Sequence, residues 1–179
     1  MRLFALPLLG LLYLCVASAQ SSEPREVQIN TPYLATPPEV VTGMLELAGV
    51  SARDVVYDLG CGDGRIVIAA ARTYGARGVG IDLNPARIDE ARANARSAAV
   101  SGLVHLEVND LFDADIRGAT VVALYLLPDV NVRLRPRLLH ELRPGTRIVS
   151  HSFGIGDWKP DKEKVIAGEH IYLWTVPPR

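Results

Sequence analysis

The residues with the clearest chemical potential are a run of glycines next to acids. Residues 58–64 read Asp-Leu-Gly-Cys-Gly-Asp-Gly and directly follow the apolar residues 55–57. A glycine turn between a strand and a helix presents backbone N–H groups and a helix N-terminus to a nucleotide-like ligand. Glycine suits this turn because a Cβ would block both the tight bend and the close approach of the ligand. The segment therefore predicts a ligand-binding loop.

More acids stand where other short apolar strands end. The run 78–81 ends at Asp82, and the run 104–108 is followed by residues 109–110, Asn-Asp. In an open parallel sheet, ligands bind at the edge formed by the carboxyl ends of the strands. Asp82 lies 22 positions after Gly60, the separation expected of a carboxylate that binds ribose hydroxyls. These acids and the glycine loop together predict a site for a ligand that contains ribose.

Alternating strands and helices must position these residues. Apolar runs predict strands, and helical spacing of apolar residues between Gly, Pro or capping residues predicts helices. The expected strands cover residues 55–58, 78–82, 104–108, 120–126 and 146–150, and the expected helices cover 64–74, 85–98 and 128–142. Asn84 is expected to cap the second of these helices. The third is expected to break at Pro136, which lacks a backbone donor.

Both ends of this alternating region carry signals of their own. Thr36 precedes two prolines, and Glu39 follows it three positions later, so Thr36 is expected to cap a helix through a capping box. Residues 165–167 and 170–176 flank a two-residue turn and predict a hairpin. The predicted fold class is α/β, with a Rossmann-like, doubly wound, mostly parallel sheet and a C-terminal antiparallel hairpin.

These motifs together resemble those of the class I S-adenosylmethionine-dependent methyltransferases over about residues 36–176. Residues 58–64 look like the first motif of that family, residues 80–85 like the second and residues 109–110 like the third. The resemblance implies S-adenosylmethionine as the cofactor. It also implies that the acid after the second strand binds ribose and that the acid after the third faces adenine. The cofactor-binding residues expected from it are Asp58, Gly60, Cys61, Gly62, Asp82, Leu83, Asn109 and Asp110.

A narrower resemblance concerns the acceptor. Residues 62–70, with Asn84 and Pro85, are similar to those of a small methyltransferase group that includes mitochondrial protein-lysine methyltransferases. That group also has a hydrophobic N-terminal segment and a proline-containing stretch like residues 31–37. The resemblance implies an enzyme that transfers a methyl group to an unidentified acceptor, with a protein lysine as the first candidate.

Two residues are candidates for catalysis. Tyr125 ends the expected fourth strand and His151 follows the expected fifth, so both lie near the ligand-binding edge. Each also has an alternative reading, Tyr125 as a core aromatic and His151 as a packing residue. Residues 125–129 read Tyr-Leu-Leu-Pro-Asp and lack the acid-Pro-Pro-aromatic motif typical of methyltransferases that act on amide or base nitrogens. With a net charge of −1, this disfavours a nucleic-acid partner.

Two other functions remain open from the sequence alone. A non-catalytic module that binds S-adenosylmethionine or a nucleotide would account for the missing motif after the fourth strand. A nicotinamide oxidoreductase is disfavoured because the loop has G-x-G-x-G spacing rather than G-x-G-x-x-G. The four histidines and Cys61 show no metal-ligand spacing, so no metal site is expected.

The N-terminus differs from the rest of this 179-residue chain, whose length predicts one domain. Residues 3–16 are apolar and uncharged, Arg2 precedes them, and residues 17–19 read Ala-Ser-Ala, as at a signal-peptide cleavage site. The expected organisation is a signal peptide or N-terminal anchor at 1–19, a linker at 20–35 and a methyltransferase domain at 36–179. A cleaved signal peptide would make the protein secreted or periplasmic.

The alternative location follows from the cofactor. S-Adenosylmethionine is made inside cells, so an uncleaved segment would instead anchor the domain to a membrane with the domain facing the cytoplasm. Membrane contact is expected only through this N-terminal segment.

Overall fold

The computed structural model describes residues 34–179. The expectations for residues 1–19, and for all but the last two residues of the expected linker, lie outside that range. Within residues 34–179, no helix is long and apolar enough to cross a membrane.

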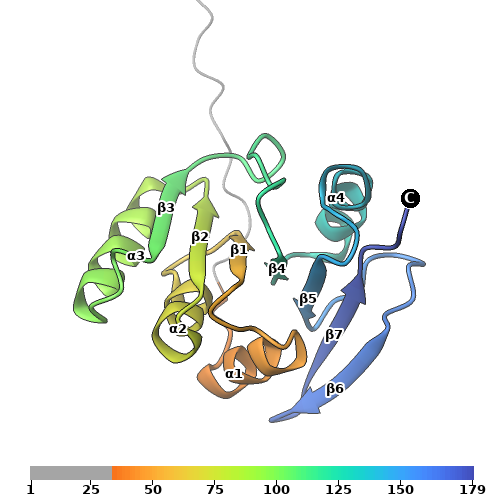
Figure 1. Cartoon of the computed structure of the whole chain (residues 1–179), viewed down its shortest axis with the longest axis horizontal. Helices are drawn as coiled ribbons and strands as arrows, with labels where there is room; N and C mark the ends of the chain where they lie inside the picture. Colours follow the sequence, from red (N-terminus) through yellow and green to blue (C-terminus); the bar gives the residue numbers. More distant parts are fainter. Residues whose placement is uncertain (1–33) are drawn as a thin grey trace, which may run out of the picture.

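The described residues build one seven-stranded sheet with the order β3-β2-β1-β4-β5-β7-β6. The strands are β1 (Val55–Leu59), β2 (Arg77–Asp82), β3 (Val104–Val108), β4 (Val121–Leu124), β5 (Arg147–His151), β6 (Lys162–Ile166) and β7 (Glu169–Thr175). Strands β1 to β5 are parallel, and β7 is antiparallel to both β5 and β6. The predicted α/β fold with a C-terminal antiparallel hairpin is therefore confirmed (Figure 1).

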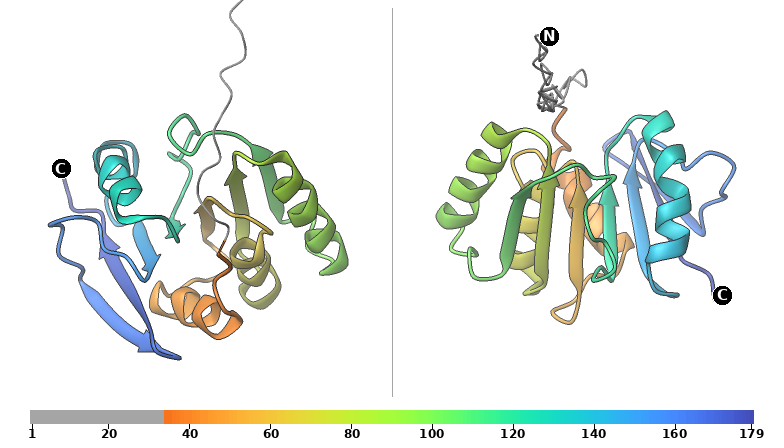
Figure 2. Two further views of the ribbon diagram at one scale, coloured as in Figure 1. Left: turned by 180° about the vertical axis from the view of Figure 1, so that it is seen from behind. Right: turned by 90° about the horizontal axis from the view of Figure 1, so that it is seen from above.

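The helices are distributed unevenly over the two faces of the sheet. They are α1 (Pro38–Leu47), α2 (Arg65–Tyr74), α3 (Pro85–Ser97) and α4 (Pro128–Glu141). Helices α1, α2 and α3 cover one face, and α4 packs on the other (Figures 1 and 2). Each buries an apolar side against the sheet, as Val67 of α2 and Leu138 of α4 illustrate.

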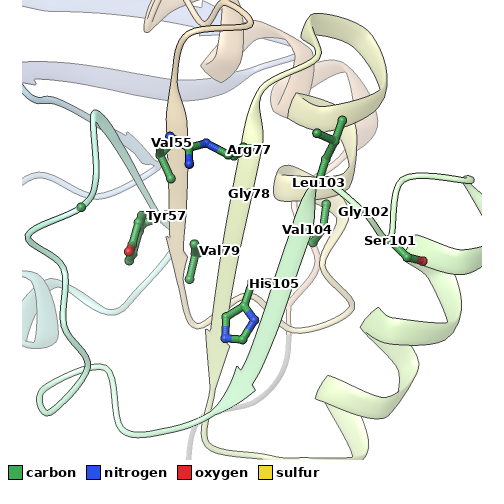
Figure 3. Close-up of a pocket in the computed structure, with 11 residues that line it drawn as sticks. Val55, Tyr57, Arg77, Gly78, Val79, Ser101, Gly102, Leu103, Val104 and His105 are labelled. Atoms are coloured by element: carbon green, nitrogen blue, oxygen red, sulfur yellow. The ribbon is translucent and has the colours of Figure 1, made fainter.

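Part of the second face is left open. Residues 109–120 connect β3 to β4 without a helix, so none of the described helices covers β1, β2 and β3 on the side of α4. A hollow of ≈ 570 Å³ lies there, bordered by Tyr57, Val79 and His105 (Figure 3). It is lined mainly by the first residues of the three strands, and it therefore lies away from their carboxyl ends.

Close packing of α2 on β2 fixes the glycine loop that precedes α2. A Cβ on Gly78 would lie 2.7 Å from Val67 Cβ, and one on Gly80 would lie 2.9 Å from Cys61 Sγ. Such distances are not tolerated, so β2 needs glycine at both positions to let the helix and the loop approach. The sequence of β2 thus sets the position of the loop that follows β1.

Two local predictions were wrong. Thr36 does not cap α1: the cap residue is Pro37, no side chain caps the helix, and the Thr36 hydroxyl lies 3.2 Å from Nδ1 of His151 instead. Helix α4 also runs through Pro136 without a break. The carbonyl that loses its hydrogen bond there belongs to the exposed residue Val132, where water can replace the missing donor.

Asn84 behaves as predicted. It caps α3, because its Oδ1 accepts a hydrogen bond of 3.0 Å from the Ala86 N–H.

Candidate active site

The carboxyl ends of β1, β2, β3 and β4 meet around one cavity of ≈ 570 Å³. Residues from the stretch just before α1 also line it. Seven of the eight predicted cofactor-binding residues line this cavity: Asp58, Gly60, Cys61, Asp82, Leu83, Asn109 and Asp110. The eighth, Gly62, lies in the same loop and donates its N–H to Asp82. The structure therefore brings together residues that lie more than 50 positions apart in the sequence.

The glycine loop is tied to the end of β2. The N–H groups of Gly60 and Cys61 both donate to the carbonyl of Ile81, over 2.8 and 2.9 Å. Gly60 has φ 90°, a left-handed conformation that favours glycine, and a Cβ there would lie 3.0 Å from Leu126 Cδ2. Glycine at this position therefore keeps the wall of the cavity open and the turn unstrained.

Asp82 is held rigidly at the end of β2. Its Oδ2 accepts the Gly62 N–H at 2.9 Å, and its Oδ1 accepts the Asn84 N–H at 2.9 Å. A carboxylate oxygen has two lone pairs, so each oxygen keeps acceptor capacity for a ligand hydroxyl. Two fixed acceptors side by side suit the vicinal hydroxyls of a ribose.

The third predicted acid is also held by backbone. Asp110 Oδ1 accepts the Phe112 N–H at 2.8 Å, which closes the turn after β3. Asn109 Nδ2 donates to Glu107 Oε1 at 3.1 Å. Both residues line the cavity next to the apolar side chains of Leu111 and Phe112. A flat, partly polar ring such as adenine fits this combination of acceptors and apolar walls.

Asp58 is the most strongly perturbed acid in the cavity. It is buried at the end of β1, and burial raises its pKa to about 8, with further increases from the nearby charges of Asp82 and Asp63. Burial likewise raises the pKa of the Cys61 thiol, which stays neutral and packs against β2. A ligand that carries positive charge would favour the ionised form of Asp58 and offset the nearby charges of Asp82 and Asp63.

The stretch before α1, Leu34–Thr36, closes the cavity from one side, and we call it the strap. Arg65 Nη1 donates to the Thr36 carbonyl at 2.8 Å, and Arg65 also pairs with Asp63 of the glycine loop at 2.6 Å. Leu34 is 66% exposed at the mouth of the cavity. The strap is therefore connected to the glycine loop through one arginine.

The two predicted catalytic candidates lie one behind the other. Tyr125 lines the cavity, and its ring centroid lies 4.0 Å from that of His151 and 6.4 Å from that of Phe153. His151 is 1% exposed and lies behind Tyr125 rather than on the cavity wall. Burial lowers the pKa of His151, against an opposing effect of Glu169, so the imidazole is neutral near pH 7.

Sequence reasoning did not find the remaining lining residues. Phe112 and Arg133 form one wall, where the guanidinium lies 4.3 Å from the ring centroid. Neither follows a strand in a recognisable motif, so only their positions in space associate them with the site. Arg65 and Arg87 also line the cavity and come from helix positions that read as ordinary polar faces.

The residues present fit S-adenosylmethionine. The fixed oxygens of Asp82 suit its ribose, the turn after β3 suits its adenine, and the buried acid Asp58 suits its positive charges. The loop glycine at 60 leaves room for the ligand to approach the backbone.

Comparison with known proteins agrees with this geometry. The model of the ANTKMT methyltransferase domain matches residues 58–162. A protein-lysine N-methyltransferase of Saccharolobus islandicus is 49% identical over 152 residues, which is 82% of this chain and 94% of the relative. An adenine nucleotide translocase lysine N-methyltransferase of Mus musculus is 34% identical over 75% of this chain, which spans 58% of that relative.

The solved structures give the same fold. An RNA methyltransferase from Salinibacter ruber in complex with S-adenosyl-L-homocysteine matches with a TM-score of 0.80 and 55% identity, over 82% of this chain and 95% of that chain. An O-methyltransferase from Thermotoga maritima, 14% identical, matches with a TM-score of 0.67 over 83% of this chain and 68% of that chain, and it supports the fold alone. The chain therefore belongs to the ANTKMT methyltransferase family and is a class I enzyme that uses S-adenosylmethionine as its cofactor.

Proposed function

We propose that this enzyme transfers a methyl group to the side-chain amine of a protein lysine. The observation that carries the proposal is the 49% identity to a protein-lysine N-methyltransferase across 94% of that relative's length. Two shorter matches, from Mus musculus and Xenopus laevis, are also lysine N-methyltransferases, and this chain spans 58% and 62% of them. We transfer from these relatives the class of acceptor, not the individual substrate protein.

The cavity has features suited to an amine acceptor. S-Adenosylmethionine, when bound, supplies a methyl group on a positively charged sulfur, and it carries its own leaving group. The protein's contribution is to hold the acceptor in line and to keep water out. Leu126, Leu127 and Val130 give the cavity apolar walls beside Tyr125, and such surroundings favour the neutral amine, the form that attacks.

A second acceptor class has one observation in its favour. The chain from Salinibacter ruber, 55% identical, is described as an RNA methyltransferase. Residues 125–129 of this chain, Tyr-Leu-Leu-Pro-Asp, lack the acid-Pro-Pro-aromatic motif, and the net charge of −1 gives no general attraction to RNA. We therefore place RNA second to protein lysine.

A radiolabel transfer assay separates the two acceptors. The full chain is incubated with S-adenosylmethionine carrying a labelled methyl group and, in parallel, with poly-L-lysine, total cell protein and total cell RNA. The proposal expects label in protein, with methyl-lysine found by mass spectrometry after digestion. Label in RNA alone would replace the lysine proposal by the RNA one. Binding of the cofactor without transfer to any of the three would favour a non-catalytic module.

A further inference from the structure

The structure leaves a buried histidine next to the active site that the cofactor-binding residues do not use. His151 ends β5, and its ring is 1% exposed. The chain around it is firmly held: Ser150 Oγ donates to the Phe153 carbonyl at 2.7 Å, and Ser152 donates its N–H to the His170 carbonyl at 2.8 Å. Ser152 also adopts φ 60°, unusual for a residue other than glycine. Strained backbone of this kind persists where the surrounding structure enforces it.

Each side of the imidazole meets a different part of the molecule. Nδ1 lies 3.2 Å from Thr36 Oγ1 in the strap, and Nε2 lies 3.4 Å from Glu169 Oε2 at the start of β7. The contact with Glu169 lacks hydrogen-bond alignment, so Nε2 has no aligned partner among the described residues. Because Nε2 faces a carboxylate, the neutral ring is best assigned its proton there. Nδ1 then accepts a hydrogen bond from the Thr36 hydroxyl.

The face of the imidazole supports the wall of the cavity. The rings of Tyr125 and His151 lie 4.0 Å apart at 31°, and Phe153 supports Tyr125 at 6.4 Å and 15°. His151 therefore touches the two cavity-lining residues, Thr36 and Tyr125, that come from the strap and from the end of β4.

The strap is connected to two sides of the cavity in different ways. Arg65, which pairs with Asp63 of the glycine loop, holds the Thr36 carbonyl, whereas His151 holds the Thr36 side chain from the side of Tyr125. Loss of His151 leaves the connection to the glycine loop intact. Loss of His151 should therefore change the binding or positioning of the acceptor, and should leave the affinity for the cofactor unchanged.

We propose that His151 is a positioning residue for methyl transfer, which fixes the Tyr125 ring and the strap where the acceptor amine enters. The proposal rests on the proposed lysine methylation. It gives His151 no contact with the reacting atoms, because the residue lies behind the cavity wall.

Kinetics of three variants test the proposal, with poly-L-lysine as the acceptor. His151→Phe keeps a ring against Tyr125 but loses the bond to Thr36. His151→Asn keeps a polar atom for Thr36 but loses the ring, and Thr36→Val replaces only the hydroxyl with a methyl group. We expect His151→Phe and Thr36→Val to lower kcat, or raise the acceptor KM, by about tenfold or more, since misplacement of about 1 Å costs up to 100-fold. We expect the dissociation constant of S-adenosylmethionine to stay within about twofold. His151→Asn should recover part of the loss caused by His151→Phe.

A control and a double variant complete the design. His105→Phe makes the same change at a histidine whose side chain is 69% exposed on the open face of the sheet (Figure 3), and its kinetics should match the wild type. The double variant Thr36→Val with His151→Phe should lose no more than either single variant, because both remove the same contact. Acceptor kinetics of His151→Phe within twofold of the wild type, or additive losses in the double variant, would overturn the proposal.

A second readout needs no acceptor. Hydrogen exchange of the peptide that contains the strap should speed up in His151→Phe and Thr36→Val, and stay unchanged in His105→Phe. Unchanged exchange in all three variants would also overturn the proposal. If the wild type methylates RNA but no lysine, the proposed function fails, yet the exchange measurement still decides whether His151 holds the strap.

Discussion

Asp82 is expected to hold the glycine loop and to bind the cofactor at the same time. Its two oxygens accept the Gly62 and Asn84 N–H groups, and the residue lines the cavity. Asp82→Ala should weaken S-adenosylmethionine binding by roughly 10- to 100-fold, since hydrogen bonds to a charged group contribute about 1.5–3 kcal/mol. Isothermal titration calorimetry measures the change. Asp89→Ala, at an exposed residue of α3 in a surface ion pair, is the matched control and should bind like the wild type. If the wild type and Asp82→Ala bind S-adenosylmethionine with equal affinity, Asp82 does not bind the cofactor.

The buried carboxyl of Asp58 should give stability an unusual pH dependence. Burial raises its pKa to about 8 from its ordinary value of 3.8. Between these values the folded state keeps a proton that the unfolded state has released, so this group's contribution to stability is present below pH 4 and is lost as the pH rises to 8. We expect the free energy of unfolding from urea titrations to fall with rising pH in that window more steeply in the wild type than in Asp58→Asn. Equal slopes would contradict the raised pKa.

The same acid should release a proton when the cofactor binds. A cation in the cavity favours the ionised form of Asp58, and so lowers the pKa that burial has raised. At pH 7, calorimetry in two buffers of different ionisation enthalpy should detect proton release for the wild type and less for Asp58→Asn. Identical binding heats in both buffers for the wild type would show that Asp58 does not titrate with the cofactor.

The close contact between β2 and the glycine loop should couple stability to cofactor binding. A Cβ on Gly80 would lie 2.6 Å from Leu106 Cδ2 and 2.9 Å from Cys61 Sγ, in the glycine loop. Gly80→Ala should therefore destabilise the fold by about 1–3 kcal/mol, the usual cost of overpacking, and also weaken S-adenosylmethionine binding. Gly102→Ala, where nothing lies within 4 Å of the new Cβ, is the control. If Gly80→Ala and Gly102→Ala have the same free energy of unfolding in chemical denaturation and the same affinity for S-adenosylmethionine in calorimetry, this coupling is contradicted.

The strands and helices of the fold were largely predictable because the sequence signals that mark them lie within a few residues of each element. Apolar runs and flanking glycines located β3 at the predicted residues 104–108, and Asn84 identified the start of α3. The capping box at Thr36 failed because its spacing alone cannot reveal a competing partner 115 positions away, His151. Strand β4 ends at Leu124, two residues before the predicted end, because the chain leaves the sheet there to form the cavity wall.

Site residues were likewise predictable where their signals are local in the sequence, and not where they depend on contacts across the fold. Residues in motifs, such as Asp82 and the glycine loop, were assigned because each motif lies at the end of one strand. Phe112 and Arg133 were missed because their contact joins a loop to α4 across the fold. His151 was placed near the site but not behind Tyr125, since sequence gives the strand on which a residue lies and not the depth of its side chain.

The molecule divides its site between two parts of one sheet. The predicted cofactor-binding residues lie at or just after the ends of β1, β2 and β3. Tyr125 directly follows β4 and His151 ends β5, beyond the point where the strand order reverses. Ligands of open α/β sheets bind at such a reversal. The strap joins the two parts through Arg65, which binds the Thr36 carbonyl, and His151, which contacts the Thr36 hydroxyl.

Where the enzyme acts depends on the segment before this domain, and we propose that it is a cleaved signal peptide. Residues 3–16 are apolar, but a membrane-spanning helix needs about 20 such residues, and Ala-Ser-Ala at 17–19 matches the small residues of a cleavage site. We expect the mature protein from full-length expression to begin at Gln20 when its N-terminus is determined by mass spectrometry. A mature chain that retains residues 3–16 and sediments with membranes would instead support the anchor, which would keep the domain on the side where the cofactor is made. The outcome also determines which proteins the enzyme can methylate, because an exported enzyme encounters different proteins from one that faces the cytoplasm.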